Sequence, residues 1–240
     1  MHTETHIYHH KQQALHGHLA YQNTTQEKRP GVLVFHDWSG CNAFAIQQAE
    51  ALADMGYVGF AADLYGDGRV GETTDEKKAL MTPLIENRAV LLERIQAAFD
   101  ALLAQPLVDK THTAAIGFCF GGLCALDLAR SNTALSGAVS FHGLLNRNKN
   151  TPIMPINSKL LVLHGYDDPM VPLEQVQAFS DEMTEAKADW QLNMYGQTTH
   201  AFTNPEANDP VLGTKYNAQT SRLAFQSMRN FLTDLFNTTI

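Results

Sequence analysis

The sequence has few cysteines, no long apolar run and no excess of basic residues. Three cysteines in 240 residues are too few, and odd in number, for a disulfide framework. The longest apolar runs have the length of a strand, far short of the roughly 20 residues that span a membrane. With 17 basic against 25 acidic residues the net charge is −8, which repels nucleic acid and anionic membranes. These absences predict a reducing, cytoplasmic environment without nucleic-acid or membrane partners.

The chain shows no break that would separate two domains. It has no internal repeat, low-complexity tract or linker, and its length suits one large core. We therefore expect a single domain over residues 1–240. The opening residues, MHTETHIYHHK, are polar, so we expect no secretory signal there. Residues 146–158 are polar and contain proline, which is typical of a surface loop.

Nearly continuous apolar runs alternate with segments that have the spacing of helices. The expected strands are 31–36, 57–64, 113–118, 136–141 and 159–165, with a less apolar sixth over 190–196. The expected helices are 43–57, 83–105, 121–131, 173–188 and 217–236. Strands that are buried on both faces of a parallel sheet have such continuous apolar runs. The alternation predicts an α/β fold with a mostly parallel central sheet and helices on both faces, and with an antiparallel edge hairpin over residues 7–22.

The segment AAIGFCFGG places Cys119 at the turn between an expected strand and an expected helix. Gly117, Gly121 and Gly122 would let the two backbones approach closely at such a turn. A helix N-terminus favours thiolate over thiol, and its amides can hold a developing oxyanion. A phosphate-binding loop is excluded because no Gly-Lys-Ser/Thr follows. On this segment alone, a small buried thiol among packing glycines remains an equal alternative.

An acid and a histidine follow in the order that a hydrolytic triad needs. Asp167 and Asp168 come directly after the strand over 159–165, and His200 follows the strand over 190–196. Loops beyond the carboxyl ends of parallel strands converge on one crevice. The order nucleophile, acid, histidine therefore predicts a site made of Cys119, Asp168 and His200.

Five segments carry a resemblance to a known family: HDWSGCNAF (36–44), AADLYG (61–66), GFCFGG (117–122), HGYDDPMVP (164–172) and THAFTNP (199–205). Through them the chain resembles the dienelactone hydrolases (carboxymethylenebutenolidases) of the α/β-hydrolase superfamily, from about residue 15 to the C-terminal helix. The resemblance implies the α/β-hydrolase fold, Cys119 as nucleophile, Asp168 rather than Asp167 as acid, and His200 as base. It also implies that the amides of Phe120 and Trp38 hold the oxyanion.

Two positions depart from that family pattern. Asp37 stands where the lactone hydrolases carry a glutamate that contacts the resting cysteine. Asn204 stands where they bind the carboxylate of the substrate with an arginine. Other arginines could supply charge, but surface or helix-pairing roles are favoured for each of them: Arg69, Arg88 and Arg94. We therefore expect a preference for uncharged esters or lactones.

The expected residues suit hydrolysis of small esters or lactones through a thioester acyl-enzyme. This chemistry needs no cofactor or metal, and we expect a monomer or homodimer that acts on a small-molecule substrate. Three alternatives remain: a general carboxylesterase or thioesterase, a non-catalytic binding protein of the same fold, and a redox sensor that pairs Cys119 with Cys124. The spacing of the two cysteines along a helix argues against the last of these.

The remaining histidines and cysteines have plainer interpretations. His36 and His142 end expected strands, so both are candidates for the substrate pocket. Six histidines crowd the N-terminus, but no cysteine or carboxylate stands at ligand spacing beside them, so we expect a polar strand face and no metal site: His2, His6, His9, His10, His16 and His18. Cys41 and Cys124 are expected to be structural thiols.

Overall fold

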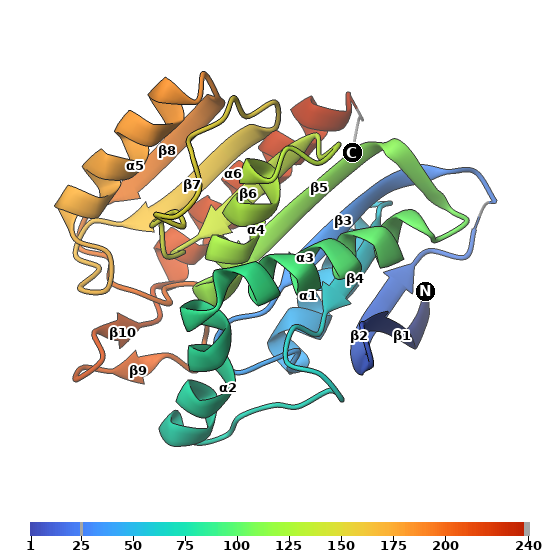
Figure 1. The fold of residues 1–240 in the computed structure, drawn as a ribbon, viewed down its shortest axis with the longest axis horizontal. Helices are drawn as coiled ribbons and strands as arrows, with labels where there is room; N and C mark the ends of the chain where they lie inside the picture. Colours follow the sequence, from blue (N-terminus) through green and yellow to red (C-terminus); the bar gives the residue numbers. More distant parts are fainter. Residues whose placement is uncertain (25, 238–240) are drawn as a thin grey trace. The chain divides into compact units, whose positions relative to one another are not determined.

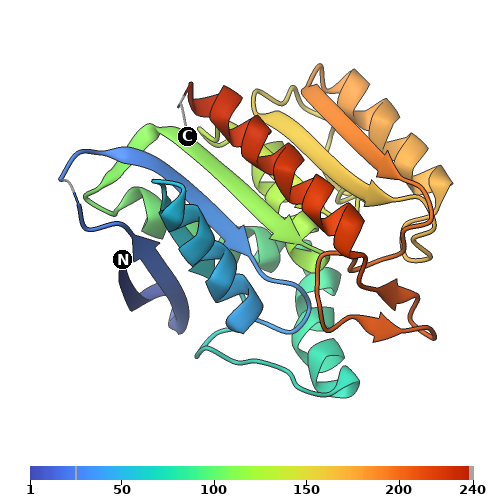
Figure 2. The same ribbon diagram turned by 180° about the vertical axis from the view of Figure 1, so that it is seen from behind.

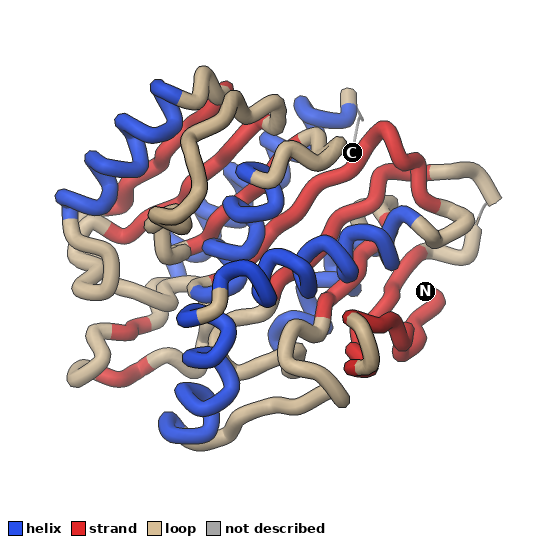
Figure 3. Tube along the Cα trace, viewed as in Figure 1, coloured by secondary structure: helices blue, strands red, loops and turns tan. Residues whose placement is uncertain are grey.

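The computed structural model describes residues 1–24 and 26–237, which form two compact units. The boundary between the units lies after Ile116, inside strand β5 (Val108–Phe118). Each unit has its own strands and covering helices, which are labelled in Figure 1 and coloured by type in Figure 3. No helix in the described residues is long and apolar enough to cross a membrane.

The first unit has strands in the order β1-β2-β4-β3-β5. Its elements are β1 (His2–His10), β2 (Gln13–Tyr21), β3 (Arg29–Phe35), α1 (Ala43–Asp54), β4 (Val58–Ala62), α2 (Thr74–Glu86), α3 (Arg88–Leu103) and most of β5. β3 and β4 are parallel, whereas β1 and β2 form an antiparallel hairpin at the edge. Figures 1 and 2 show α3 on one face of these strands and α1 on the other.

The second unit has parallel strands in the order β6-β7-β8. Its elements are α4 (Phe120–Arg130), β6 (Gly137–Phe141), β7 (Lys159–Gly165), α5 (Leu173–Glu185), β8 (Asp189–Tyr195), β9 (Asn208–Asp209), β10 (Thr214–Lys215) and α6 (Ala218–Phe236). α4 and α5 lie on one face of the strands, and α6 lies on the other (Figures 1 and 2). β9 and β10 pair as a short antiparallel hairpin outside this sheet.

Burial explains the apolar runs of the second unit. All of β6 and all of β7 except Lys159 are buried, as expected for parallel strands covered on both faces. β8 ends the strand order and is only half-buried. On one side of β8, Trp190 packs edge-on against Phe179 of α5 at 6.1 Å between ring centroids. On the other side, Asn193 donates a hydrogen bond to Ser227 of α6 at 3.3 Å.

Most expected elements are present, but the prediction of a single helix over residues 83–105 was wrong. The structure has two helices there, and the first begins nine residues earlier than expected, at Thr74. A capping box of Thr73 and Glu76 starts α2, and Pro83 lies inside it. Asn87 then leaves the helical conformation, and its side chain accepts the amide hydrogen of Val90 to start α3.

Smaller differences concern element boundaries. The N-terminal hairpin begins at His2 rather than at residue 7, and β5 begins at Val108 rather than at residue 113. The β9–β10 hairpin was not expected. The N-terminal histidines do lie on the paired strands β1 and β2. Several of them meet single polar partners on neighbouring elements, as in the pairs His10–Glu93 (2.7 Å), His18–Glu50 (3.2 Å) and His6–Gln105 (3.1 Å).

Candidate active site

Cys119 occupies the turn between β5 and α4 in a strained conformation. Its φ of 55° and ψ of −115° lie in a region that side-chain-bearing residues rarely adopt. Its amide donates to the carbonyl of Phe141 at 3.0 Å, and the residue is half-buried. A Cβ on Gly117 would collide with the carbonyl oxygen of Gly121, so the close approach expected at this turn is present. The turn thus places Cys119 directly before the first residue of α4.

Asp168 follows β7 and is 3% exposed, whereas its neighbour Asp167 is exposed. One carboxylate oxygen of Asp168, Oδ1, accepts the amide hydrogen of Met170 at 2.8 Å. The other oxygen, Oδ2, lies 2.8 Å from Nδ1 of His200. Both aspartates follow the same strand in the sequence, but they differ in burial, and Asp168 is the one that contacts the ring of His200.

His200 lies in the loop after β8 and is 1% exposed. Burial alone would lower its pKa, but the negative charge of Cys119 and the hydrogen bond to Asp168 outweigh it and raise the pKa to about 10. Nδ1 is committed to Asp168, which leaves the buried Nε2 outside that contact, and a side-chain hydrogen bond with Cys119 adds to the raised pKa of His200. Nε2 is thus the nitrogen left to exchange a proton with Cys119 or with a bound molecule.

Two further buried histidines lie near His200. His142, directly after β6, is hydrogen-bonded through Nε2 to Thr203 at 2.8 Å. Its ring stands edge-on to the ring of His200, with centroids 5.2 Å apart. Burial and the charge of His200 hold the pKa of His142 well below its usual value. Burial likewise lowers the pKa of His164, the penultimate residue of β7. Both rings are therefore neutral near pH 7.

His142 was predicted from the sequence as a pocket residue, whereas His164 was not. His164 stands in the run KLLVLHG, close to the carboxyl end of a strand. The same position next to a strand end had drawn attention to His36 and His142. A polar ring in an otherwise apolar, buried strand was the available signal.

Three predicted site residues, His36, Asp37 and Trp38, directly follow β3 in the first unit, and their hydrogen bonds hold the loop there. His36 is buried, accepts the amide hydrogen of Leu64 at Nε2 (3.3 Å) and meets the carbonyl of Asp37 through Nδ1 (2.5 Å). Asp37 accepts the amide hydrogen of Ser39 at 2.8 Å. The carbonyl of Trp38 accepts a hydrogen bond from the Tyr65 hydroxyl at 2.8 Å.

The other predicted pocket residues belong to the second unit. Phe120 is the first residue of α4, so its N–H lies at the helix N-terminus. Asn204 follows His200 by four residues and is half-buried. Its side-chain oxygen accepts the amide hydrogen of Glu206 at 3.0 Å, which closes a turn.

Two of the candidate arginines, Arg69 and Arg94, serve the first unit. Both guanidinium groups donate to backbone carbonyls of residues 64–66, and burial lowers the pKa of Arg94. Arg88 is the first residue of α3.

Neither of the two remaining cysteines has the properties of a nucleophile. Cys124 is completely buried in α4. The Cys41 sulfur donates a weak hydrogen bond to the carbonyl of Ala61 at 3.7 Å. Burial and the charge of Asp63 raise the pKa of Cys41 to about 12, so this thiol is un-ionised at neutral pH.

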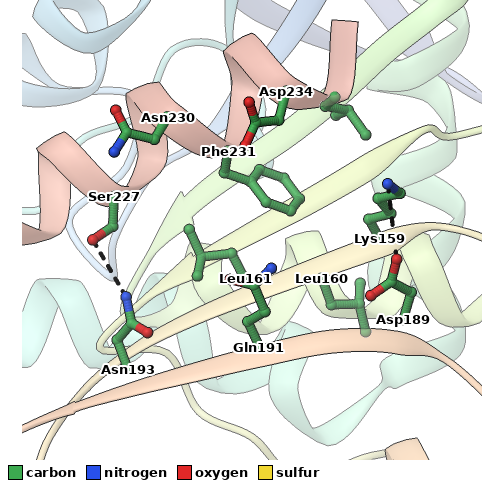
Figure 4. Close-up of a pocket in the computed structure, with 11 residues that line it drawn as sticks. Lys159, Leu160, Leu161, Asp189, Gln191, Asn193, Ser227, Asn230, Phe231 and Asp234 are labelled. Atoms are coloured by element: carbon green, nitrogen blue, oxygen red, sulfur yellow. Dashed lines mark hydrogen bonds and ion pairs between the residues drawn. The ribbon is translucent and has the colours of Figure 1, made fainter. Parts of the chain in front are cut away.

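The second unit also has a pocket of about 270 Å³ between β7, β8 and α6 (Figure 4). The residues that line it include Lys159 and Asp189, which form an ion pair at 3.8 Å, and the apolar Leu161 and Phe231. None of the three predicted triad residues lines it. This pocket is therefore separate from the histidine–aspartate pair.

Residues 16–236 match the family model of the dienelactone hydrolase family. The chain belongs to this family. A solved dienelactone hydrolase-like promiscuous phosphotriesterase from metagenomic libraries is 36% identical, with a TM-score of 0.94 and 98% of both chains covered. Among curated proteins, an uncharacterized protein of Caenorhabditis elegans is 35% identical over 149 residues (61% of this chain and 94% of that one). A carboxymethylenebutenolidase homolog of Xenopus tropicalis is 25% identical over 163 residues (67% and 65%).

These comparisons confirm the family and the α/β-hydrolase fold expected from the sequence. This dienelactone hydrolase family member is a hydrolase of carboxylic ester bonds.

Proposed function

We propose that the protein hydrolyses small esters or lactones with Cys119 as nucleophile, His200 as acid and base, and Asp168 as the residue that orients His200. The observation that carries the proposal is the buried Nδ1–Oδ2 contact of 2.8 Å between His200 and Asp168, together with the rise in the pKa of His200 caused by Cys119. A thiolate and an imidazolium that stabilise each other supply both a nucleophile and a proton donor.

The reaction runs in two halves. The Cys119 thiolate attacks the carbonyl carbon, and the tetrahedral oxyanion accepts hydrogen bonds from the N–H of Phe120 and, as the family resemblance implies, of Trp38. His200 protonates the leaving alkoxide, and a thioester remains on Cys119. The neutral histidine then takes a proton from water, and the resulting hydroxide attacks the thioester. The carboxylic acid departs and the thiolate–imidazolium pair returns.

The proposed substrate is small and uncharged. The ring of His142 lies next to that of His200, and its lowered pKa keeps it neutral. His142 therefore offers no positive charge to an anionic substrate. Asn204, where lactone hydrolases carry an arginine, has no charge and uses its side-chain oxygen in a turn. A buried carboxylate without a cationic partner binds poorly.

Turnover of a substrate panel tests this proposal. We expect hydrolysis of p-nitrophenyl acetate and of a neutral aryl lactone, and loss of turnover in Cys119→Ala. A Cys124→Ala variant is the matched control, because that thiol is fully buried in α4, the helix that Cys119 directly precedes. Turnover that survives in Cys119→Ala, or a panel without any hydrolysed ester, would contradict the proposal.

Phosphotriester hydrolysis is a second candidate activity. The observation in its favour is the promiscuous phosphotriesterase that matches 98% of this chain at a TM-score of 0.94. In this reaction the Cys119 thiolate would attack phosphorus and expel a phenolate, and water would then cleave the phosphorus–sulfur bond. Release of p-nitrophenolate from paraoxon, dependent on Cys119, is the expected result. A rate equal to that of Cys119→Ala would exclude this activity.

A further inference from the structure

The short β9–β10 hairpin holds the backbone of His200 on both sides. The His200 amide donates to the carbonyl of Gly213 at 3.2 Å, and the His200 carbonyl accepts from the amide of Lys215 at 3.1 Å. His200 thereby forms an isolated parallel bridge with Thr214. Both backbone polar groups of the histidine are thus bonded to one hairpin.

The same hairpin contacts the loop that carries the acid. Gly213 has a φ of +67°, which favours glycine. A Cβ at this position would collide with the Pro169 ring, where it would lie 3.0 Å from Cδ and closer still to Cγ. Pro169 directly follows Asp168. Gly213 therefore accepts the amide hydrogen of His200 with its carbonyl oxygen and also packs against Pro169, the residue after Asp168.

The hairpin has several hydrogen bonds of its own, and its tip is exposed. Asp209 accepts the amide hydrogens of Val211 and Leu212 at 2.8 and 3.0 Å. The amide of Tyr216 donates to Ala207 at 2.9 Å. Val211, at the tip, is 92% exposed. A surface hairpin that buries little apolar area contributes little to the free energy of unfolding. Its specific contacts are those of Gly213 and Lys215 with His200, and of Gly213 with Pro169.

We propose that the β9–β10 hairpin is a positioning element for His200 and Asp168, and that Gly213 is its key positioning residue. Only the expected effect on kcat rests on the proposed function; the positioning of His200 by the hairpin does not depend on it. A side chain at position 213 would push the hairpin away from Pro169 and draw the His200 backbone with it. Because proton transfer depends steeply on placement, a displacement below 1 Å is enough to slow turnover.

The test compares Gly213→Ala with Gly196→Ala. Gly196 lies in the same loop before His200, but a Cβ there meets nothing within 4 Å. The direct readout is the downfield proton NMR signal of the His200 Nδ1–H that is hydrogen-bonded to Asp168, which is observable without any substrate. We expect this signal to weaken or vanish in Gly213→Ala and to persist in Gly196→Ala. We also expect kcat for an ester to fall about tenfold or more with KM changed less than twofold.

A rescue variant separates the contact from the backbone strain. In Gly213→Ala combined with Pro169→Ala, the atoms that the new Cβ would strike are absent, so the signal and most of the lost kcat should return. If Gly213→Ala does not fold, Lys215→Pro tests the same hairpin, because it deletes the N–H that donates to His200; the expected result is again loss of the signal.

A folded Gly213→Ala or Lys215→Pro protein with the wild-type signal and kcat would overturn the inference. If the wild type turned over no ester at all, the proposed function would fail. The NMR comparison would then still decide whether the hairpin positions His200.

Discussion

His200 Nδ1 lies 2.8 Å from Asp168 Oδ2, and both side chains are buried, while Asp167 one residue earlier is exposed. Two adjacent carboxylates thus have different surroundings on one turn. Their amide variants form a matched pair, because each removes one negative charge at nearly the same place in the chain.

Asp168→Asn should lower kcat by roughly 10³- to 10⁴-fold, since an amide can present its NH₂ group to Nδ1 and favour the wrong tautomer of the ring. Asp167→Asn should leave kcat within about twofold. Steady-state kinetics on one aryl ester, with circular dichroism to verify folding, measures both. The assignment of the acid is wrong if Asp167→Asn is the more damaging change.

Iodoacetamide should label Cys119 faster than Cys41 or Cys124 by an order of magnitude or more at pH 7.5. Cys41 has a pKa of about 12 and is un-ionised, and Cys124 is completely buried. Cys119 is half-buried and faces a histidine whose pKa is raised. Peptide mass spectrometry over a time course gives the three rates, and equal labelling would remove the case for a nucleophilic Cys119.

The protein should lose stability as the pH falls below about 6.5, and His142 should account for part of this loss. The pKa of His142 is lowered by folding, so in this range the unfolded chain binds a proton that the folded chain does not. The free energy of unfolding therefore falls by up to about 1.4 kcal/mol per pH unit for this group.

His142→Gln removes the titrating ring and retains a side chain that can hydrogen-bond to Thr203. Between pH 6.5 and 5.5, its free energy of unfolding should depend less steeply on pH than that of the wild type. Urea unfolding at several pH values measures both slopes. Identical slopes would mean that His142 is not held neutral in the folded protein.

Asn204→Arg should shift the substrate preference toward anions. A guanidinium four residues after His200 would pair with a substrate carboxylate, so kcat/KM for a carboxylate-bearing lactone should rise about tenfold relative to that for its methyl ester. Asn204→Met is the control, because it also deletes the side-chain oxygen that bonds to Glu206 but adds no charge. A wild type that already prefers the anion strongly would contradict the proposed preference for neutral substrates.

The buried strands and the order of the triad candidates could be predicted because their signals are local. The expected strand over 159–165 coincides with β7, since its apolar run reflects burial on both faces. The division of one expected helix at Asn87 was missed because a leucine- and alanine-rich pattern continues across it, while the caps that divide it depend on a few polar side chains.

The β9–β10 hairpin could not be predicted for a different reason. Two-residue strands have no periodicity, and the bonds from Gly213 and Lys215 to His200 join segments that nothing in the local sequence connects. The roles of Asp37 and Trp38 and the single domain over residues 1–240 stay predictions.

The most direct test of the account is the covalent intermediate on Cys119. The protein is mixed with p-nitrophenyl acetate, quenched in acid within the burst of p-nitrophenolate release, digested and examined by mass spectrometry. We expect an acetyl group on the peptide that contains Cys119, its removal by hydroxylamine as for a thioester, and its absence in Cys119→Ala. A burst whose acetyl group is found on another residue, or a burst that persists unchanged in Cys119→Ala, would contradict the account.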